Sequence, residues 1–335
     1  MMKYIDLSIS DRRDICHRVQ SELGLNRQII EKDWWVTAAL RALFALPYSD
    51  SLSFKGGTSL SKCWSLIDRF SEDVDIAVNR EFLGFDGVLT KTQISDKLRR
   101  ASCSFVRERL QFDLKQEMIT QGIDANKFNV SVNITPVSTT DPEMIEVQYN
   151  SIFDDLPYIK RTVIIEVGGR SMKEQTTEVA LCSMIDSVYK GAPFAEPSFN
   201  VSTVVVERTF IEKICLLHEE FAKPHNRIRT ERMSRHLYDI AKIMDSPYAG
   251  HAIADKNLYL SVIEHRRTFI GLKGFDYDTL RPQTISIVPP DDIIDSWRKD
   301  YEAMRETMIY GESLPFEQLI EKIAELNVRL NEMEY

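Results

Sequence analysis

One stretch constrains the fold of this chain more than any other, because it places a glycine turn between an apolar strand and an acidic strand. Residues 52–78 read Leu-Ser-Phe-Lys-Gly-Gly-Thr-Ser-Leu-Ser-Lys-Cys-Trp-Ser-Leu-Ile-Asp-Arg-Phe-Ser-Glu-Asp-Val-Asp-Ile-Ala-Val. Gly56 and Gly57 let the backbone turn tightly and approach a ligand, and Thr58 can cap a helix that runs on through Ile67. Since a helix N-terminus favours bound anions, we expect a phosphate-binding turn followed by a short helix.

Two aspartates follow this predicted helix. Asp73 and Asp75 alternate with Val74 and Ile76, so a strand would place both carboxylates on one face and the apolar side chains on the other. The strand rise separates the two Cβ atoms by roughly 6 to 7 Å, which lets the carboxylates bracket a divalent cation. A glycine turn or an acidic strand alone is also found in ordinary surface structure. Together they place like charges beside a phosphate-type turn, which is costly unless a cation binds.

The composition is that of a globular protein without membrane segments. The chain has 335 residues, 43% of them hydrophobic, which is enough for one large domain or two ordinary ones. No apolar run approaches the roughly 20 residues of a spanning helix, and the N-terminus lacks the apolar core of a signal peptide. The five cysteines are scattered and never spaced Cys-x-x-Cys. We expect reduced, structural cysteines, the cytoplasm as location and no membrane partner.

The charge balance limits nucleic-acid binding to a local surface. A net charge of −9 argues against general binding, because such affinity comes from Lys and Arg side chains that neutralise phosphates. Residues 223–236, here called the basic patch, are the best candidate for a local interface. A solvated loop and helix start would look similar. The patch contains Lys223, His225, Arg227, Arg229, Arg232, Arg235 and His236 against the single acid Glu231.

The order of apolar patterns predicts an α+β fold. Helical periodicity covers residues 11–23, 26–46 and 94–120, and strand patterns cover 129–137, 144–152 and 162–167. With the strands around the glycine turn, these make a mixed sheet of about five strands flanked by helices. A short helix within 180–191 and a strand-like segment at 201–206 follow. The rest is helical, at 209–222, 230–244, 252–269, 290–308 and 315–330. We therefore predict a sheet domain at 1–206 and a helical domain at 207–335.

Several charged residues outside the first stretch have two interpretations. Glu31, Lys32 and Asp33 are expected at the helix surface, because neighbours at i,i+1 do not pair with each other. Glu166 is the only acid in the apolar run 163–167, where an unpaired carboxylate is costly. We interpret Glu166 as a third acid beside the aspartate pair; the alternative is a buried ion pair with Arg170.

Two helices of the second half carry charges near an apolar stripe. Lys213 lies three residues after Phe210, at the edge of the inward side of its helix. Arg235, His236 and Asp239 fall within about one turn of the next helix. Both sets also fit ordinary ion pairs on a helix surface, so from spacing alone a functional role is the minority interpretation.

Five blocks in this order resemble the motifs of the AbiEii/AbiGii-type nucleotidyltransferases, the toxins of type IV toxin–antitoxin and abortive-infection systems. These are related to the MenT toxins and more distantly to the DNA polymerase beta superfamily. Thr58 stands where the superfamily has serine, and the spacing to Asp73 is longer than in minimal nucleotidyltransferases. The blocks are residues 54–62, 69–75, 165–170, 207–213 and 232–239.

The resemblance implies roles for matched residues. The resemblance implies catalytic roles for Asp73, Asp75, Glu166, Lys213 and Asp239. It implies nucleotide binding by Gly56, Gly57, Thr58, Lys62, Arg69, Ser71 and Arg235. Asp73, Asp75 and Glu166 would hold Mg²⁺ or Mn²⁺, and Glu166 would otherwise act as a base. The resemblance also predicts that the sheet domain and the helical domain both contribute to one active-site cleft.

The implied activity is the transfer of NMP from an NTP to an acceptor, with RNA such as tRNA as the expected acceptor. The resemblance further implies a cognate antitoxin that acts at the level of expression or by phosphorylation rather than by tight binding. Two alternatives stay open. The acceptor could be a protein side chain, or the chain could be a nucleotide-binding module without catalysis.

Overall fold

The computed structural model describes residues 2–71, 73–132, 142–154, 160–170 and 174–334. The chain divides into two compact units, Met1–Cys63 with Glu72–Thr203, and Trp64–Ser71 with Val204–Tyr335. The chain therefore leaves the first unit after Cys63, returns before Asp73 and leaves again after Thr203. The predicted domains, 1–206 and 207–335, are continuous and so do not include the grouping of 64–71 with the second unit. The domain boundary at residue 206 stays a prediction.

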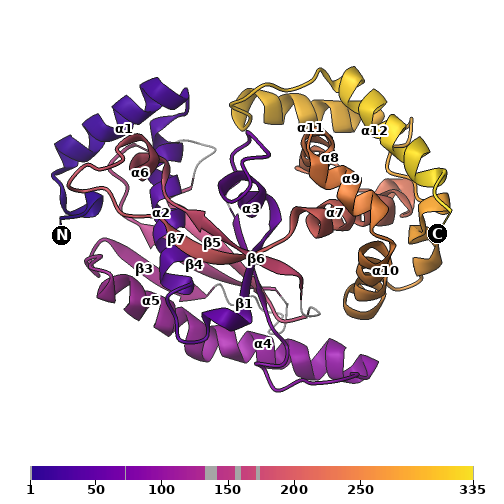
Figure 1. The fold of residues 1–335 in the computed structure, drawn as a ribbon, viewed down its shortest axis with the longest axis horizontal. Coiled ribbons are helices and arrows are strands. Elements are labelled where there is room, and N and C mark those ends of the chain that lie inside the picture. Colours follow the sequence, from indigo (N-terminus) through magenta and orange to yellow (C-terminus); the bar gives the residue numbers. More distant parts are fainter. Residues whose placement is uncertain (1, 72, 133–141, 155–159, 171–173, 335) are drawn as a thin grey trace. The chain divides into compact units, whose positions relative to one another are not determined.

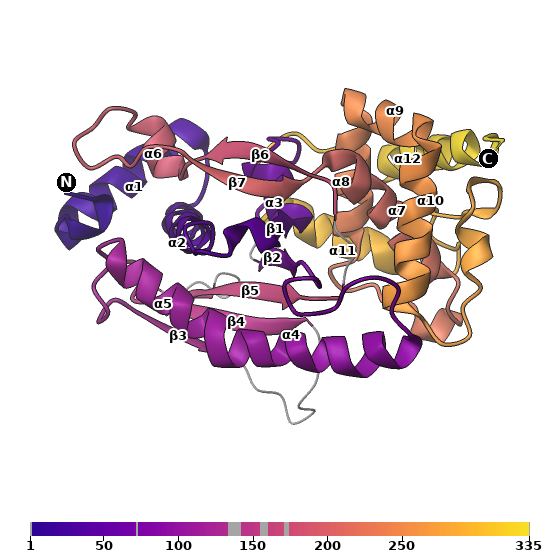
Figure 2. The same cartoon turned by 60° about the horizontal axis from the view of Figure 1, so that its bottom comes forward.

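The first unit is built on a mixed sheet, and the predicted α+β class is confirmed. Seven strands follow the order β3-β4-β5-β2-β1-β7-β6. Figure 1 shows the sheet, and its strands are labelled in this order in Figure 2. β2 pairs with β1 antiparallel and with β5 parallel, so it lies at the centre of the sheet. The strands are β1 Leu52–Lys55, β2 Asp73–Val78, β3 Phe128–Val132, β4 Glu143–Tyr149, β5 Thr162–Gly168, β6 Thr176–Leu181 and β7 Phe199–Val204.

The sheet has more strands than the five or so expected from the sequence. β6 was missed because most of its side chains are exposed or half-buried, which leaves no alternating apolar pattern to detect. The strand-like segment at 201–206 is β7, which pairs in parallel with β1. Residues 133–137 of the predicted third strand lie outside the described residues.

Helices cover the sheet of the first unit. α2 is almost entirely buried and packs against α1, α5 and α6. The predicted long helix is one helical run over Gln93–Thr120, shown beside β3 and β4 in Figure 2. The helices are α1 Ile9–Leu23, α2 Arg27–Leu43, α3 Gly56–Lys62, α4 Arg99–Phe105, α5 Gln111–Thr120 and α6 Met184–Val188.

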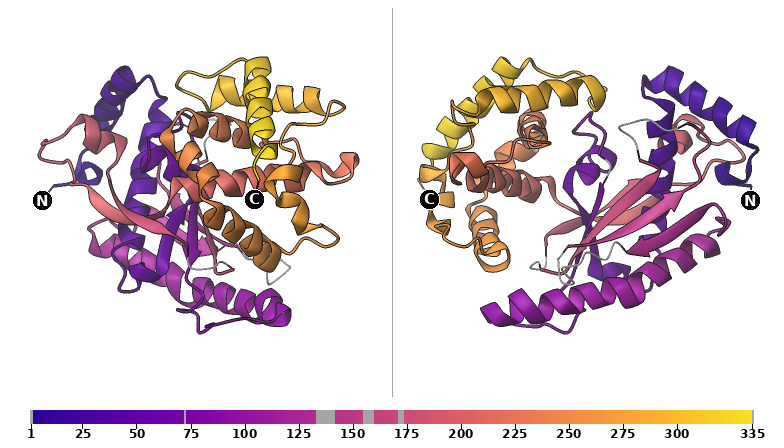
Figure 3. Two further views of the ribbon diagram at one scale, coloured as in Figure 1. Left: turned by 45° about the vertical axis from the view of Figure 1, so that its right-hand side comes forward. Right: turned by 180° about the vertical axis from the view of Figure 1, so that it is seen from behind.

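The second unit is helical, as its orange to yellow ribbons show in Figure 3. α7 packs against α8, α9 and α10, and α8 also packs against α11 and α12. The predicted helix at 252–269 is divided because Asp255 caps a new helix by accepting the Leu258 N–H. In the described part of the chain, no helix is long and apolar enough to span a membrane. The helices are α7 Val206–Phe221, α8 Ser234–Met244, α9 Pro247–Ala254, α10 Lys256–His265, α11 Ile294–Thr307 and α12 Phe316–Asn331.

The segment Trp64–Ser71 is bound into the second unit along its length. The Phe70 N–H donates to the Met308 carbonyl at 2.8 Å, and the Tyr310 N–H donates to the Asp68 carbonyl at 2.9 Å. The Asp68 carboxylate also pairs with Lys242 of α8 at 2.8 Å. The link between the glycine turn and the acidic strand is therefore part of the helical unit's structure.

Candidate active site

The glycine turn leads directly into helix α3, which begins at Gly56 and ends at Lys62. The prediction of a helix capped by Thr58 and running to Ile67 is wrong in both respects. Thr58 lies inside the helix, and its hydroxyl donates to the Asp73 carbonyl oxygen at 2.5 Å. This buried hydrogen bond ties the turn to the first residue of β2, so Thr58 positions the two parts of the motif relative to each other.

Gly56 and Asp75 are in direct contact. Gly56 has φ +78°, a conformation that glycine adopts at little cost. A Cβ atom built at this position would lie 1.8 Å from the Asp75 Oδ2 atom, which no real side chain can tolerate. The carboxylate therefore occupies the space that a side chain would need, and the glycine turn and the acidic strand form one site.

Strand register brings three charged side chains onto one row of the sheet. Lys55 on β1 is the Cα partner of Asp75 on β2, and Asp75 is the Cα partner of Glu166 on β5. Residues paired in this way project from the same face, with Cβ atoms about 5 Å apart. Asp73 lies on this face two residues before Asp75. The expected proximity of Glu166 to the aspartate pair is thus present in the register.

The donor set fits a cation that is held partly by substrate. No three His, Cys, Asp or Glu side chains lie close enough to hold a metal ion within the described ranges. Two carboxylates are nevertheless sufficient for Mg²⁺, which usually keeps several waters and takes further oxygens from substrate phosphates. Asp73 and Asp75 are suited to that role, and metal binding by all three acids stays a prediction.

The sequence prediction for Glu31, Lys32 and Asp33 is wrong, because all three side chains on α2 are buried, with 2%, 1% and 5% exposure. Glu31 accepts the Ile152 N–H at 2.9 Å, and burial raises the pKa of its carboxyl. Asp33 accepts the Met184 N–H at 2.7 Å at the start of α6. These partners lie far away in the sequence. Local spacing alone therefore gives no sign that the three charged side chains are buried.

Asp33 also fixes one of the expected nucleotide-binding residues. The Lys62 ammonium at the end of α3 forms an ion pair with the other oxygen of the Asp33 carboxylate. Asp33 therefore links α2, α3 and α6, and Lys62 is held by protein in this structure. Ser71, another expected nucleotide-binding residue, is half-buried at the end of the segment 64–71.

The second unit contains a buried ionic cluster around Asp239 of α8. The Arg69 Nε and Nη2 atoms bind the two carboxylate oxygens at 2.7 and 2.8 Å, and the Lys213 ammonium binds Oδ2 at 2.8 Å. Burial by itself would raise the pKa of Asp239, but the two cations outweigh it and hold the pKa below its usual value. Asp239 is therefore ionised at neutral pH and fixes the Lys213 ammonium in place.

The two charged or polar neighbours of Asp239 on α8, Arg235 and His236, differ in burial. His236 is buried, and burial together with Lys213 and Arg235 lowers the pKa of its imidazole, so the ring is neutral at pH 7. Arg235 is half-buried. These residues lie on one helix turn, as their spacing predicts; His236 and Asp239 are buried, whereas Arg235 is half-buried.

Comparison with known proteins identifies the family. A family model described as the nucleotidyl transferase AbiEii toxin of type IV toxin–antitoxin systems matches residues 38–322. The chain belongs to this family. The resemblance inferred from the motifs is therefore confirmed, and membership implies an NTP substrate and a cognate antitoxin.

The fold of this AbiEii-family chain is similar to that of a solved toxin structure. MenT4, a nucleotidyltransferase toxin from Mycobacterium tuberculosis H37Rv, has 14% sequence identity and a TM-score of 0.53. The match covers 98% of this chain and 91% of MenT4. Among curated proteins, none matches this chain.

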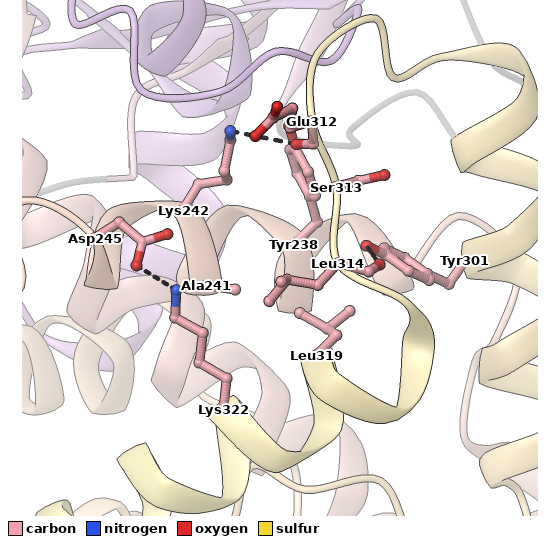
Figure 4. A pocket seen from close by; sticks show the side chains of 10 residues that line it. All are labelled: Tyr238, Ala241, Lys242, Asp245, Tyr301, Glu312, Ser313, Leu314, Leu319 and Lys322. Carbon is pink, nitrogen blue, oxygen red and sulfur yellow. Dashed lines mark hydrogen bonds and ion pairs between the residues drawn. The ribbon is translucent and has the colours of Figure 1, made fainter.

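The AbiEii-family chain also has a pocket of about 210 Å³ in its second unit (Figure 4). Lys242 and Asp245 of α8 and Lys322 of α12 contribute charged groups to its wall, and Lys322 is paired with Asp245. Lys213 and Asp239 do not line it. The pocket is therefore separate from the ionic cluster, although α8 contributes to both.

The basic patch of this toxin is partly neutralised by acids. Glu220 binds the Lys223 ammonium at 2.7 Å and the Arg229 Nε and Nη2 atoms at 3.0 and 2.7 Å. His225 is paired with Asp292. Arg227 is exposed and makes no ion pair with any described residue. Glu220 and Asp292 therefore offset part of the positive charge that the sequence of the patch carries.

Proposed function

We propose that this toxin transfers an NMP from an NTP to a hydroxyl group of an RNA acceptor, with tRNA as the expected class. The observation that carries the proposal is the contact between Gly56 and Asp75, with Asp73 and Glu166 on the same face of the sheet. This contact supports the proposal, because a glycine turn can approach phosphates closely and neighbouring carboxylates suit a divalent cation.

In the proposed reaction, the acceptor hydroxyl oxygen forms a bond to the α-phosphorus of the NTP. The bond from that phosphorus to the bridging oxygen of the β-phosphate breaks, and pyrophosphate leaves. We assign the hydroxyl proton to Glu166, the carboxylate beside Asp75. Gly57 and Thr58 hold the phosphates through backbone N–H groups, since the Thr58 hydroxyl is engaged with Asp73. Asp73 and Asp75 would hold Mg²⁺ or Mn²⁺, which would supply charge neutralisation for the phosphates.

The cluster of the second unit has a supporting role in the proposal. Lys213 contacts the departing pyrophosphate, and Asp239 holds its ammonium in position. Arg69 shares Asp239 with Lys213, so it orients the same group. Lys62, Ser71 and Arg235 complete the nucleotide-binding set. We propose that both clusters act on one nucleotide, and that the toxin works in the cytoplasm.

The test of the proposed function compares Asp73→Asn and Asp75→Asn with Asp86→Asn, which changes an exposed aspartate of the same unit. Each protein is incubated with labelled NTPs, one at a time, and total cellular RNA. The two site variants should lose transfer by about 10³-fold with little change in melting temperature, since Asn preserves size and removes charge. Asp86→Asn should be fully active. Full activity of the purified Asp75→Asn protein would contradict the proposal.

The same experiment also shows whether the acceptor is RNA or protein. Adding lysate protein in place of RNA tests transfer to a protein side chain. Label in the RNA fraction supports the proposal, whereas label in the protein fraction alone supports the alternative enzyme. Tight NTP binding with no release of pyrophosphate from any NTP in either mixture would indicate a binding module.

A further inference from the structure

Lys55 is a charged residue at the proposed active site to which the sequence motifs give no role. It is the last residue of β1 and directly precedes Gly56. Its register partner is Asp75, so its side chain projects from the same face of the sheet as the acids. A lysine on the acidic face of the sheet, one residue before the phosphate turn, is well placed to meet a triphosphate.

Glu174 forms an ion pair with this lysine. The Glu174 Oε1 atom lies 3.4 Å from the Lys55 Nζ atom, and the Glu174 side chain is almost fully buried, with 1% exposure. The Lys55 side chain is 29% exposed. A buried carboxylate therefore pairs with the Lys55 ammonium, while the lysine keeps access to solvent.

The charge balance of the site favours a role in substrate binding. Asp73, Asp75 and Glu166 share one face of the sheet, and a triphosphate would bring further negative charge to it. Lys55 lies on this same face, so its positive charge can offset the repulsion between the carboxylates and the phosphates. Lys62, the other lysine of this motif, lies at the end of α3 and pairs with Asp33 of α2.

We propose that Lys55 is a further catalytic residue of this toxin, whose ammonium contacts the β- and γ-phosphates of the NTP and is positioned by Glu174. The inference rests on the proposed function and adds a group to its site. As the bond between the α-phosphorus and the bridging oxygen breaks, the electron pair stays with that oxygen, and Lys55 stabilises the resulting charge on pyrophosphate. Lys55 keeps its proton throughout.

The test measures the affinity for inorganic pyrophosphate with Mg²⁺ by calorimetry, together with kcat and KM for NMP transfer. Lys55→Met removes the charge and keeps an unbranched side chain. It should weaken pyrophosphate binding at least 10-fold and lower kcat/KM by about 10² to 10³. Lys55→Arg should retain more of both. Lys91→Met, at an exposed lysine of the same unit, makes the same change in net charge and should match the wild type.

Glu174→Gln leaves Lys55 in place and releases its anchor, so we expect a loss of a few-fold in pyrophosphate affinity. This variant decides the question if Lys55→Met fails to fold. Wild-type affinity in a folded Lys55→Met or Glu174→Gln protein, including one with a lowered melting temperature, would overturn the inference. Because the pyrophosphate titration needs no acceptor, it gives an answer even if the wild-type toxin labels no RNA and the proposed function fails.

Discussion

At the scale of single residues, Gly56 combines a backbone requirement with a steric one. Its φ of +78° alone disfavours any L-residue, and the Asp75 carboxylate fills the space of a Cβ atom. Gly122 provides a natural comparison, because its φ is +90° and nothing lies within 4 Å of the position of its Cβ atom. The two glycines therefore separate the cost of backbone strain from the cost of displacing Asp75.

We predict that Gly56→Ala abolishes NMP transfer and destabilises the protein more than Gly122→Ala does. Gly122→Ala should lower the free energy of unfolding by roughly 1–2 kcal/mol, the cost of the left-handed conformation, and leave transfer unchanged. Gly56→Ala adds the movement of Asp75 to a similar strain. Urea unfolding and the labelled-NTP assay measure both effects. Equal activity of the two variants would mean that the position of Asp75 is not critical.

At the scale of elements, the bounds of helix α2 could be predicted from the sequence, but the burial of its charged residues could not. Its periodicity predicted residues 26–46, close to the observed Arg27–Leu43. The same reasoning placed Asp33 at the surface, because its partners, Lys62 and the Met184 N–H, belong to α3 and α6. Periodicity reports which local face is apolar, whereas the burial of a charge depends on partners that only the tertiary fold supplies.

The same limit explains why Lys55 was missed. The motif identified Gly56, Gly57, Asp73 and Asp75 because they are close in sequence and in a recognisable order. The importance of Lys55 follows from its register with Asp75 across two strands, which no local pattern contains.

We predict that Asp33→Asn loosens both helices that Asp33 joins to α2. The substitution leaves the buried Lys62 ammonium without its charged partner, which typically costs about 3–5 kcal/mol. Hydrogen exchange of backbone amides should accelerate in α3 and at the start of α6. The matched control is Asp14→Asn, at an exposed position of α1. It should change neither the stability of the protein nor the hydrogen exchange of α3 and α6. Slow exchange in α3 of the Asp33→Asn protein would show that other contacts hold this helix.

At the scale of the whole molecule, the α+β class and the positions of most helices could be predicted, but the grouping of residues 64–71 with the second unit could not. The sequence predicts one boundary near residue 206, where strand patterns give way to helical ones, whereas the segment Trp64–Ser71 is grouped with the second unit. Its attachment depends on Arg69 binding Asp239 and on a short backbone pairing with residues 308–310. These contacts join residues far apart in the chain, so composition and periodicity carry no trace of them.

Net charge is also a property of the whole molecule, and it bears on the proposed RNA acceptor. Because the net charge is −9, we expect RNA to bind through exposed cations of the basic patch such as Arg227 and Arg232. We predict that Arg227→Ala weakens RNA binding and reduces the slope of log K against log salt by about one, without changing NTP affinity. Arg329→Ala, at an exposed arginine of α12, changes the net charge equally and should leave the slope as it is. If both variants lower RNA affinity to the same extent, the overall field and not the patch attracts the acceptor; if neither does, RNA binds elsewhere on the toxin.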